Sequence, residues 1–307
     1  LRTLIAERFV IDADFDHGSI AYKETISAPA VGIGHYEPLR HYAEVHLLLE
    51  PGEPGSGLVF DTDCSEDILS KNWQRLVLTH LEEKVHRGVL IGAPITDMKI
   101  TLKSGRAHVK HTEGGDFRQS VYRAVRQGLM QAHSVLLEPF YAFHLTIPDK
   151  MVGRAMTDLE RRFAVFEGPV LEDGEAILTG RAPVSALDGY QTEVTAYTGG
   201  LGQMICTLDG YGPCHNEEEI IAAAGYDADA DLANPSGSVF CTHGAGFVVN
   251  WDEVKDYMHL ESCLRAEKET TPAQESAPRG PSAPRTGAAL DKELQAIYER
   301  TYGAVKQ

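Results

Sequence analysis

The stretch SGRAHVKHTEGGDFR, residues 104–118, combines side chains and backbone that could hold an anion such as phosphate. Arg106 and Lys110 supply positive charge, and the two histidines can stack or donate hydrogen bonds. Gly114 and Gly115 permit positive φ angles and close backbone approach, and a helix beginning beside them would offer free N–H groups. The candidate binding residues are Arg106, His108, Lys110, His111, Thr112, Glu113, Gly114 and Gly115.

The chain as a whole is acidic, but its charge is unevenly distributed. The formal net charge is −17, yet residues 99–130 carry seven lysines and arginines against two acids. Residues 217–231, by contrast, carry six acids and no base. This net charge argues against a protein that coats itself in nucleic acid. The basic segment therefore indicates either one local contact with an anionic partner or a solvated helix face.

Histidines and cysteines near the C-terminus could form a zinc site from Cys241, His243, His259 and Cys263. Their spacing matches no common zinc finger, so buried thiols beside ordinary histidines are favoured, with a zinc-stabilised interaction module as an alternative. His35, His41 and His46 surround the start of a predicted strand. Because side chains alternate along a strand, neighbours should lie on opposite faces, and we expect no metal shared by these three.

No segment matches G-x-x-x-x-G-K-[ST], the loop that cradles nucleotide phosphates. The glycine-rich segments 30–38 and 243–247 do not follow a strand and open a helix, as a dinucleotide site requires. No Ser/His/Asp set or carboxylate pair is recognisable from spacing. We therefore expect no cofactor and no GTPase activity in this chain.

The composition is that of a globular protein with a substantial core. Of 307 residues, 43% are hydrophobic, which suits two or three domains. The sequence has no run of about 18 apolar residues and no signal peptide, and its five scattered cysteines suit reduced thiols. We expect a cytoplasmic monomer with no membrane partner. The sequence opens on Leu1 instead of methionine, which suggests a piece of a longer protein.

The pattern of apolar residues predicts the elements that position the 104–118 stretch. Residues 43–49 read as a strand, and an amphipathic helix follows Ser65 and ends at Gly88. The core positions of that helix are Trp73, Val77, Leu81 and Val85. Residues 95–103 alternate as a strand, a turn at Ser104 and Gly105 follows, and residues 106–110 return as the hairpin partner. Asp116 should cap a helix that continues through His133.

The second half predicts a β-α-β-β-α-β unit, the order of a ferredoxin-like fold. Its strands are expected at 140–147, near 163–171, at 175–182 and at 202–211, with one helix from Asp149 and another opened by a capping box at Ser185–Asp188. Residues 264–289 are rich in proline and poor in apolar residues, which indicates a disordered linker. Residues 290–305 show helical spacing and predict a terminal docking helix.

Four segments, in order and spacing, resemble the C-terminal half of ribosome-binding translational GTPases. The relatives are elongation factor G and, more closely, the tetracycline-resistance ribosomal protection proteins. GSIAYKETI (18–26) is similar to the last strand of domain III, and DMKITLKSGRAHVKHTEGGDFR (97–118) to the domain IV hairpin and tip. SVLLEPFYAFHLTIPDKMVGRAMTDLERR (134–162) and APVSALDGYQTEVTAYTGGLGQMICTL (182–208) are similar to the two halves of domain V.

The resemblance implies an α+β chain with a ribosomal-protein-S5-like β/α domain IV and a ferredoxin-like domain V. Its parts would be a domain III remnant, domain IV, domain V, an acidic extension, the linker and a C-terminal helix. The corresponding ranges are 1–26, 27–133, 134–216, 217–263, 264–289 and 290–305.

The resemblance also implies a ribosomal partner. Domain IV would reach the decoding region of the small subunit, where elongation factor G accompanies translocation and the protection proteins expel tetracycline. His108 occupies the place of the tip histidine of elongation factor G, and Lys110, His111 and Thr112 fall in the loop that protection proteins direct at the drug site. GTP and Mg²⁺ would bind a G domain upstream. A ribosomal protection factor is thus the first hypothesis, and an elongation-type factor without a resistance role is the alternative.

Overall fold

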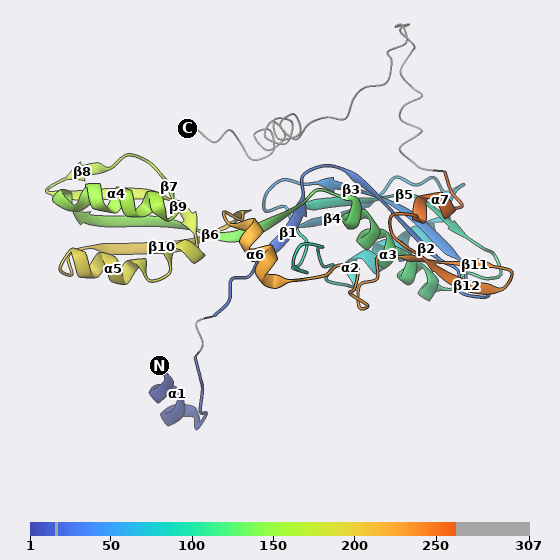
Figure 1. Cartoon of the computed structure of the whole chain (residues 1–307), viewed down its shortest axis with the longest axis horizontal. Coiled ribbons are helices and arrows are strands. Elements are labelled where there is room, and N and C mark those ends of the chain that lie inside the picture. The colour runs from blue at the N-terminus through green and yellow to red at the C-terminus, as the bar shows by residue number, and fades with distance from the viewer. Residues whose placement is uncertain (16–17, 262–307) are drawn as a thin grey trace, which may run out of the picture. The chain divides into compact units, whose positions relative to one another are not determined.

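The computed structural model describes residues 1–15 and 18–261, which divide into two compact units (Figure 1). One unit combines the N-terminal 22 residues with Glu138–His215, and the other combines Lys23–Leu137 with the chain from Asn216. The predicted linker 264–289 and helix 290–305 lie outside the described residues. No helix in the described ranges is long and apolar enough to cross a membrane.

A six-stranded sheet organises the second unit, with the strand order β12-β11-β2-β3-β5-β4 (Figure 1). Strand β3 runs antiparallel to both of its neighbours, β2 and β5, whereas β4 is parallel to β5 and β11 is parallel to β2. The strands are β2 (Ala30–Tyr36), β3 (Ala43–Pro51), β4 (Leu58–Thr62), β5 (Met98–Ala107), β11 (Ser238–Thr242) and β12 (Ala245–Val249).

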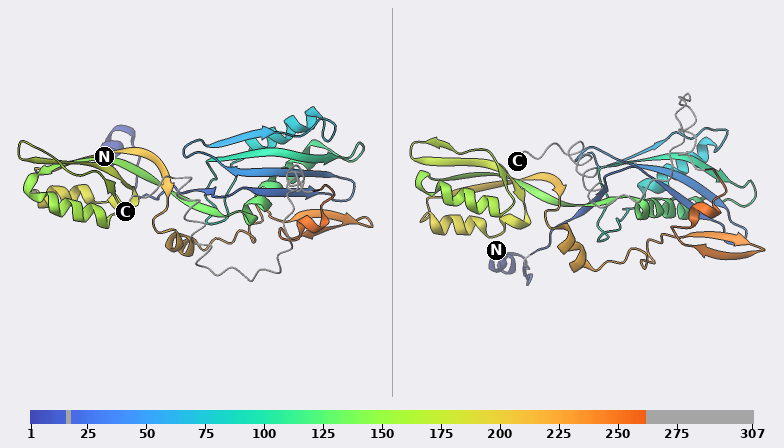
Figure 2. Two further views of the ribbon diagram at one scale, coloured as in Figure 1. Left: turned by 90° about the horizontal axis from the view of Figure 1, so that it is seen from above. Right: turned by 45° about the horizontal axis from the view of Figure 1, so that its top comes forward.

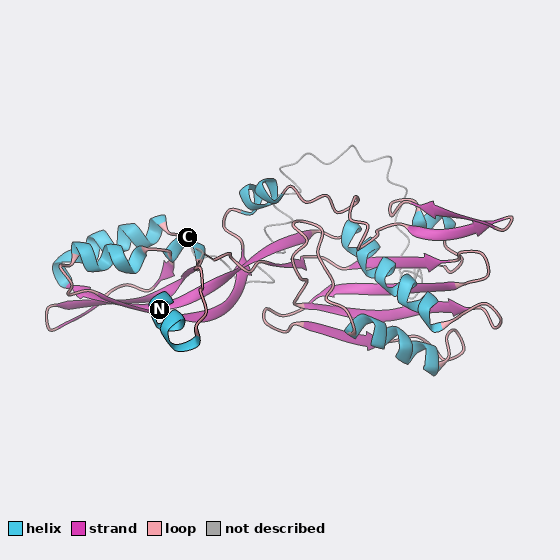
Figure 3. Cartoon of the chain, turned by 90° about the horizontal axis from the view of Figure 1, so that it is seen from below, coloured by secondary structure: helices cyan, strands magenta, loops and turns pink. Residues whose placement is uncertain are grey.

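Helices α2 (Lys71–Glu82) and α3 (Gly114–Gln131) lie across this sheet (Figure 3). Their apolar sides join β3 and β5 in a core that includes Leu47, Val77 and Phe117, each with no exposed surface. Strand β2 approaches α3 very closely, because a Cβ atom at Gly32 would lie 2.0 Å from the carbonyl oxygen of Ala124. Glycine on β2 therefore lets the helix backbone rest directly on the strand.

The structure corrects three sequence predictions around the 104–118 stretch. Residues 95–110 form no hairpin: β5 runs through Ser104 and Gly105 as one strand, with an irregular register opposite His46 and Leu47. Helix α2 begins at Lys71, six residues after the predicted start. Val85 lies beyond that helix and is mostly exposed, whereas Val77 and Leu81 are buried as expected. Helix α3 is capped by Glu113 instead of Asp116.

The first unit has the predicted β-α-β-β-α-β order. Its main strands are arranged β10-β6-β9-β7, which is the ferredoxin-like order and confirms the predicted fold class. The expected capping box at Ser185 is absent: a 3₁₀ turn, Ser185–Leu187, precedes helix α5, whose cap is Gly189. The elements are β6 (Ser134–Pro148), α4 (Val152–Arg161), β7 (Val165–Phe166), β8 (Val170–Glu172), β9 (Glu175–Pro183), α5 (Tyr190–Tyr197) and β10 (Gln203–Pro213).

Two N-terminal elements complete the description. Strand β1 (Lys23–Ile26) pairs antiparallel with the first four residues of β6. Helix α1 (Arg2–Phe9) has no buried residue.

The acidic extension is part of the second unit. It contains helix α6 (Glu217–Ala224), strands β11 and β12, and helix α7 (Val254–Tyr257), and β11 lies beside β2 at one side of the sheet (Figure 2). Phe240 and Val254 from the extension join Ile33 of β2 in a small second core. The extension therefore completes the sheet of the unit.

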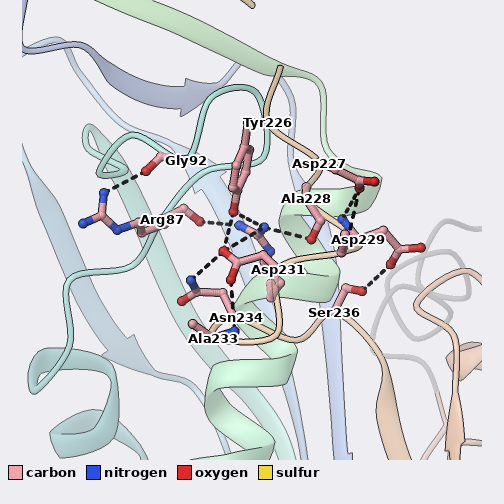
Figure 4. A network of polar contacts seen from close by, with 12 residues as sticks. Arg87, Gly92, Tyr226, Asp227, Ala228, Asp229, Asp231, Ala233, Asn234 and Ser236 are labelled. Atoms are coloured by element: carbon pink, nitrogen blue, oxygen red, sulfur yellow. Dashed lines mark hydrogen bonds and ion pairs between the residues drawn. The ribbon is translucent and has the colours of Figure 1, made fainter. Parts of the chain in front are cut away.

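Arg126 of α3 fixes the acidic segment of the extension, whose residues Tyr226, Ala228 and Asp231 are labelled in Figure 4. Its guanidinium is almost fully buried and donates to the backbone oxygens of Arg87, Gly88 and Ala228 and to the hydroxyl of Tyr226. Tyr226 in turn donates to Asp231, 2.6 Å away. This hydrogen bond, with one from Asn234, lowers the pKa of Asp231 to about 2. The acids at the end of the segment thus act partly as structural acceptors.

Candidate nucleic-acid interface

The loop between β5 and α3, residues 108–113, is held in shape by Thr112 and Tyr42. The Thr112 hydroxyl accepts the backbone N–H of His108 at 2.6 Å and donates to the backbone oxygen of Tyr42 at 2.5 Å. The Tyr42 N–H donates to the backbone oxygen of His111 at 3.1 Å. We call residues 37–42 and 108–113 the tip, because these two loops meet at one end of the sheet through those bonds.

The side chains of residues 108–111 in the tip point away from the core. His108, Lys110 and His111 are exposed, and Val109 between them is fully exposed as well. The imidazoles of His108 and His111 stack on each other with ring centroids 4.4 Å apart. The tip therefore presents a pair of flat rings and a lysine ammonium on a loop whose backbone is fixed.

The N-terminus of α3 departs from the sequence prediction. Gly114 and Gly115 are the first helical residues and neither has a positive φ angle. Glu113 and Asp116 form a reciprocal capping box, in which the Asp116 carboxylate accepts the Glu113 N–H at 2.8 Å. Asp116 also contacts His41 at 2.9 Å. The capping box uses the N–H groups of Glu113 and Asp116, so carboxylates already occupy part of the helix end that was expected to bind phosphate.

Most of the cations in residues 99–130 have partners elsewhere in the structure. Lys99, Lys103 and Arg118 form ion pairs with Asp61, Asp63 and Glu83, while Arg123 and Arg126 donate to backbone oxygens of the extension. Arg106 and Lys110 form no ion pair with any residue that the structure describes, and both are exposed. Of the basic segment, Arg106 and Lys110 are thus the cations left available to an anionic partner, and both lie at one end of the sheet beside His108 and His111.

Sequence reasoning missed the contribution of the loop 37–42. Arg40 is exposed on it and makes no ion pair within the described ranges. Tyr42 is almost buried beneath it, with the guanidinium of Arg106 6.0 Å from the centre of its ring. The loop EPLRHY offers no motif of its own, and only the pairing of β3 with β5, in which Ala43 lies opposite Ala107, brings it beside residues 108–113.

A buried polar cluster lies directly behind the tip. The Glu44 carboxylate contacts His35 at 2.7 Å and His46 at 2.9 Å, and it accepts the backbone N–H groups of His259 and Leu260, each at 2.9 Å. Burial acts to raise the pKa of Glu44, but hydrogen bonds from the two histidines outweigh burial and hold it well below its usual range.

This cluster corrects the prediction that the histidines lie apart on opposite faces. His35 and His46 share one carboxylate, because His35 pairs with Glu44 across the two strands and His46 follows Glu44 by two positions. His41 is turned away toward Asp116.

The predicted four-residue zinc set is not assembled in the described part of the chain. Cys241 lies in β11 and His243 in the turn that follows, whereas His259 lies beyond α7 and contacts the Tyr42 hydroxyl at 3.1 Å. Cys263 lies outside the described residues. The groups whose ligand atoms do converge are His35, Glu37 and His259, and Glu138, Cys214 and His215.

Comparisons with known proteins match both units. A family model described as elongation factor G, domain IV, matches residues 18–133, and one described as elongation factor G C-terminus matches residues 135–220. Residues 18–26, expected to end domain III, thus fall within the domain IV match. A crystal structure of a protein from Thermus thermophilus shares the fold with a TM-score of 0.63 and 24% identity over 71% of this chain. The chain spans 34% of that protein's length.

Proposed function

The chain belongs to the elongation factor G family, whose domain IV and C-terminal domain it carries, and on this premise we propose that its tip contacts small-subunit ribosomal RNA. The observation that carries the proposal is the exposed set His108, Lys110 and His111 on a loop fixed by Thr112 and Tyr42. Such a set suits RNA because cations replace counterions at phosphates and flat rings stack on unpaired bases.

The charge of the rest of the chain fits a contact restricted to the tip. The net charge of −17 opposes general binding to nucleic acid, and the paired or buried cations of residues 99–130 leave Arg106 and Lys110 as the local positive charge. The proposed partner is therefore the ribosome, bound by a monomer. GTP and Mg²⁺ belong in this proposal to a G domain of the parent protein.

Within the family, we assign the parent first to the ribosomal protection factors, whose domain IV displaces tetracycline at the decoding region. The likeness of residues 97–118 to the tip of those factors supports this assignment. The second candidate is an elongation-type factor with no resistance role. It is favoured by the charged tip, since Lys110 beside His108 and His111 is more charged than the tip of the protection factors.

Co-sedimentation of the purified chain with small ribosomal subunits tests the RNA contact. Replacing His108, Lys110 and His111 together with alanine should weaken binding about tenfold or more, because one phosphate contact and a stacking platform are lost. Lys99→Ala is the matched control, since it removes one positive charge from the opposite end of β5. Equal binding by the triple variant, or equal weakening by Lys99→Ala, would refute the proposed tip contact.

Growth in tetracycline separates the two assignments. Expression of the full-length parent in a sensitive host should raise the tetracycline concentration that stops growth, and the triple tip variant should abolish the increase. No increase with the unmodified parent, together with retained ribosome binding, would identify the elongation-type alternative.

A further inference from the structure

We propose that His35, Glu37 and His259 form a binding site for a divalent first-row metal ion, with Zn²⁺ the best match. One ligand atom from each of the three side chains lies within 4.8 Å of the other two. Two imidazoles and one carboxylate are a donor set that zinc uses in sites with three protein ligands. The site is independent of the proposed ribosomal contact.

Glu44 determines which nitrogen of His35 is free for a metal. Its two carboxylate oxygens face four groups, namely His35 Nδ1, His46 Nε2 and the backbone N–H groups of His259 and Leu260. Each of these oxygens already accepts a backbone N–H, so the carboxylate faces His35 as an acceptor and the proton of a neutral His35 ring lies on Nδ1. The lone pair of His35 is thereby left on Nε2, the atom that points toward Glu37.

The contact between His35 and Glu37 requires a proton or a metal ion between the two atoms. His35 Nε2 and a carboxylate oxygen of Glu37 are 3.1 Å apart, and the imidazole of His35 is fully buried. A neutral imidazole has only one proton, which His35 already donates to Glu44, so two lone pairs would face each other here. Either a second proton or a metal ion must separate them, and the position of His259 favours the metal.

The rings of the two histidines are held in place as in known metal sites. Phe240 stacks flat on His35 with ring centroids 4.0 Å apart, and Glu44 binds the other ring nitrogen. His259 Nδ1 contacts the Tyr42 hydroxyl at 3.1 Å, which restrains the imidazole that would supply the third ligand. A second hydrogen-bonding partner on each ligating histidine fixes its ring and tautomer, as is usual for zinc ligands.

The site connects three parts of the second unit. His35 lies near the end of β2, Glu37 directly follows that strand, and His259 comes from the extension after α7. Tyr42 connects the site to the tip, since its backbone bonds His111 and Thr112 while its hydroxyl meets His259. A bound metal would therefore fasten the extension to the sheet immediately behind the tip.

Calorimetric titration of the metal-free 307-residue chain with Zn²⁺ tests the site. We expect saturable binding at this site and a higher melting temperature with metal. Glu37→Gln and His259→Ala should each weaken binding about tenfold or more. Both side chains are at least partly exposed, so the metal-free variants should stay folded, which tryptophan fluorescence can verify.

Two control variants define which residues bind the metal. The double variant Cys241→Ala, His243→Ala removes the alternative thiol set, and His215→Ala disrupts the second converging group. Both should retain the high-affinity site. Co²⁺ bound in place of Zn²⁺ should show ligand-field absorption without a thiolate charge-transfer band.

Three results would overturn the proposal. The first is the absence of saturable Zn²⁺ binding, with His35 carrying protons on both ring nitrogens by nitrogen-15 NMR. The second is a thiolate band in the Co²⁺ spectrum. The third is unchanged affinity in both Glu37→Gln and His259→Ala.

Discussion

Replacing Arg126 with methionine should destabilise the second unit by about 3 to 5 kcal/mol. The side chain of Arg126 is only 3% exposed, and its guanidinium donates four hydrogen bonds, at 2.6 to 3.0 Å, between α3 and two other segments. Asp231 lies 3.9 Å from the same guanidinium. Methionine matches the apolar stem of arginine but supplies no donor, so these acceptors lose their common partner.

The size of this destabilisation follows from the acceptors that lose their donor when Arg126 is replaced. Removing one partner of a buried charged pair costs about 3 to 5 kcal/mol, because the remaining polar groups stay desolvated and unpaired. Tyr226 and Asp231 keep their mutual hydrogen bond, which limits the loss. With a typical dependence of about 2 kcal/mol per molar urea, the midpoint of unfolding should fall by about 2 M.

Urea denaturation followed by tryptophan fluorescence measures this change in the right unit. The sequence has two tryptophans, Trp73 and Trp251, and both lie in the second unit. Arg118→Met on the same helix is the control, since the half-exposed Arg118 pairs with Glu83 at the surface and should cost less than about 1 kcal/mol. Equal, small losses for both variants would refute the structural role of Arg126.

Two further predictions concern packing and pH. Gly32→Ala should lower the free energy of unfolding by about 3 kcal/mol in the same assay, because the added Cβ would lie 2.0 Å from the carbonyl oxygen of Ala124. Gly115→Ala is the control, since the space around Gly115 is open and the variant should not be destabilised. Equal effects of the two substitutions would contradict the close approach of α3 to β2. Folding lowers the pKa of Asp231 from 3.8 to about 2. The ionised carboxylate therefore stabilises the folded state fully above pH 3.8, and this contribution is lost as the pH falls toward 2. Asp231→Asn should flatten this part of the curve of unfolding free energy against pH, and an unchanged slope would refute that contribution.

The ferredoxin-like unit could be predicted because its elements are signalled locally. The alternating and helical patterns of apolar residues in 140–211 predicted each strand and helix in turn. Their order along the chain, β-α-β-β-α-β, then indicated the fold that the sheet shows. The hairpin at Ser104 and Gly105 was wrong for a packing reason. A Cβ at Gly105 would lie 2.8 Å from the Leu69 side chain, so glycine is needed there for space within a strand and marks no turn.

Contacts between residues far apart in the sequence could not be predicted from local sequence patterns. Residues 217–263 were expected only as an acidic extension, yet β11 within them joins the sheet through the pairing of Val239 with Tyr36. The cluster of His35, Glu44 and His46 depends on the register between β2 and β3, which their spacing in the sequence does not reveal. The exposed loop 108–113 was only partly predictable, because residues 106–110 were expected as a strand and only the residues next to Gly114 and Gly115 indicated a loop.

The salt dependence of ribosome binding tests the proposed RNA contact most directly. Each phosphate neutralised by a lysine steepens the fall of the binding constant with salt, so Lys110→Ala should reduce the slope of log K against log salt by about one. The Lys110 ammonium is exposed and makes no ion pair with a described residue, so unfolding free energy should change by less than about 0.5 kcal/mol. An unchanged slope, with the variant folded and bound as tightly as the parent chain, would contradict contact between the tip and RNA phosphates.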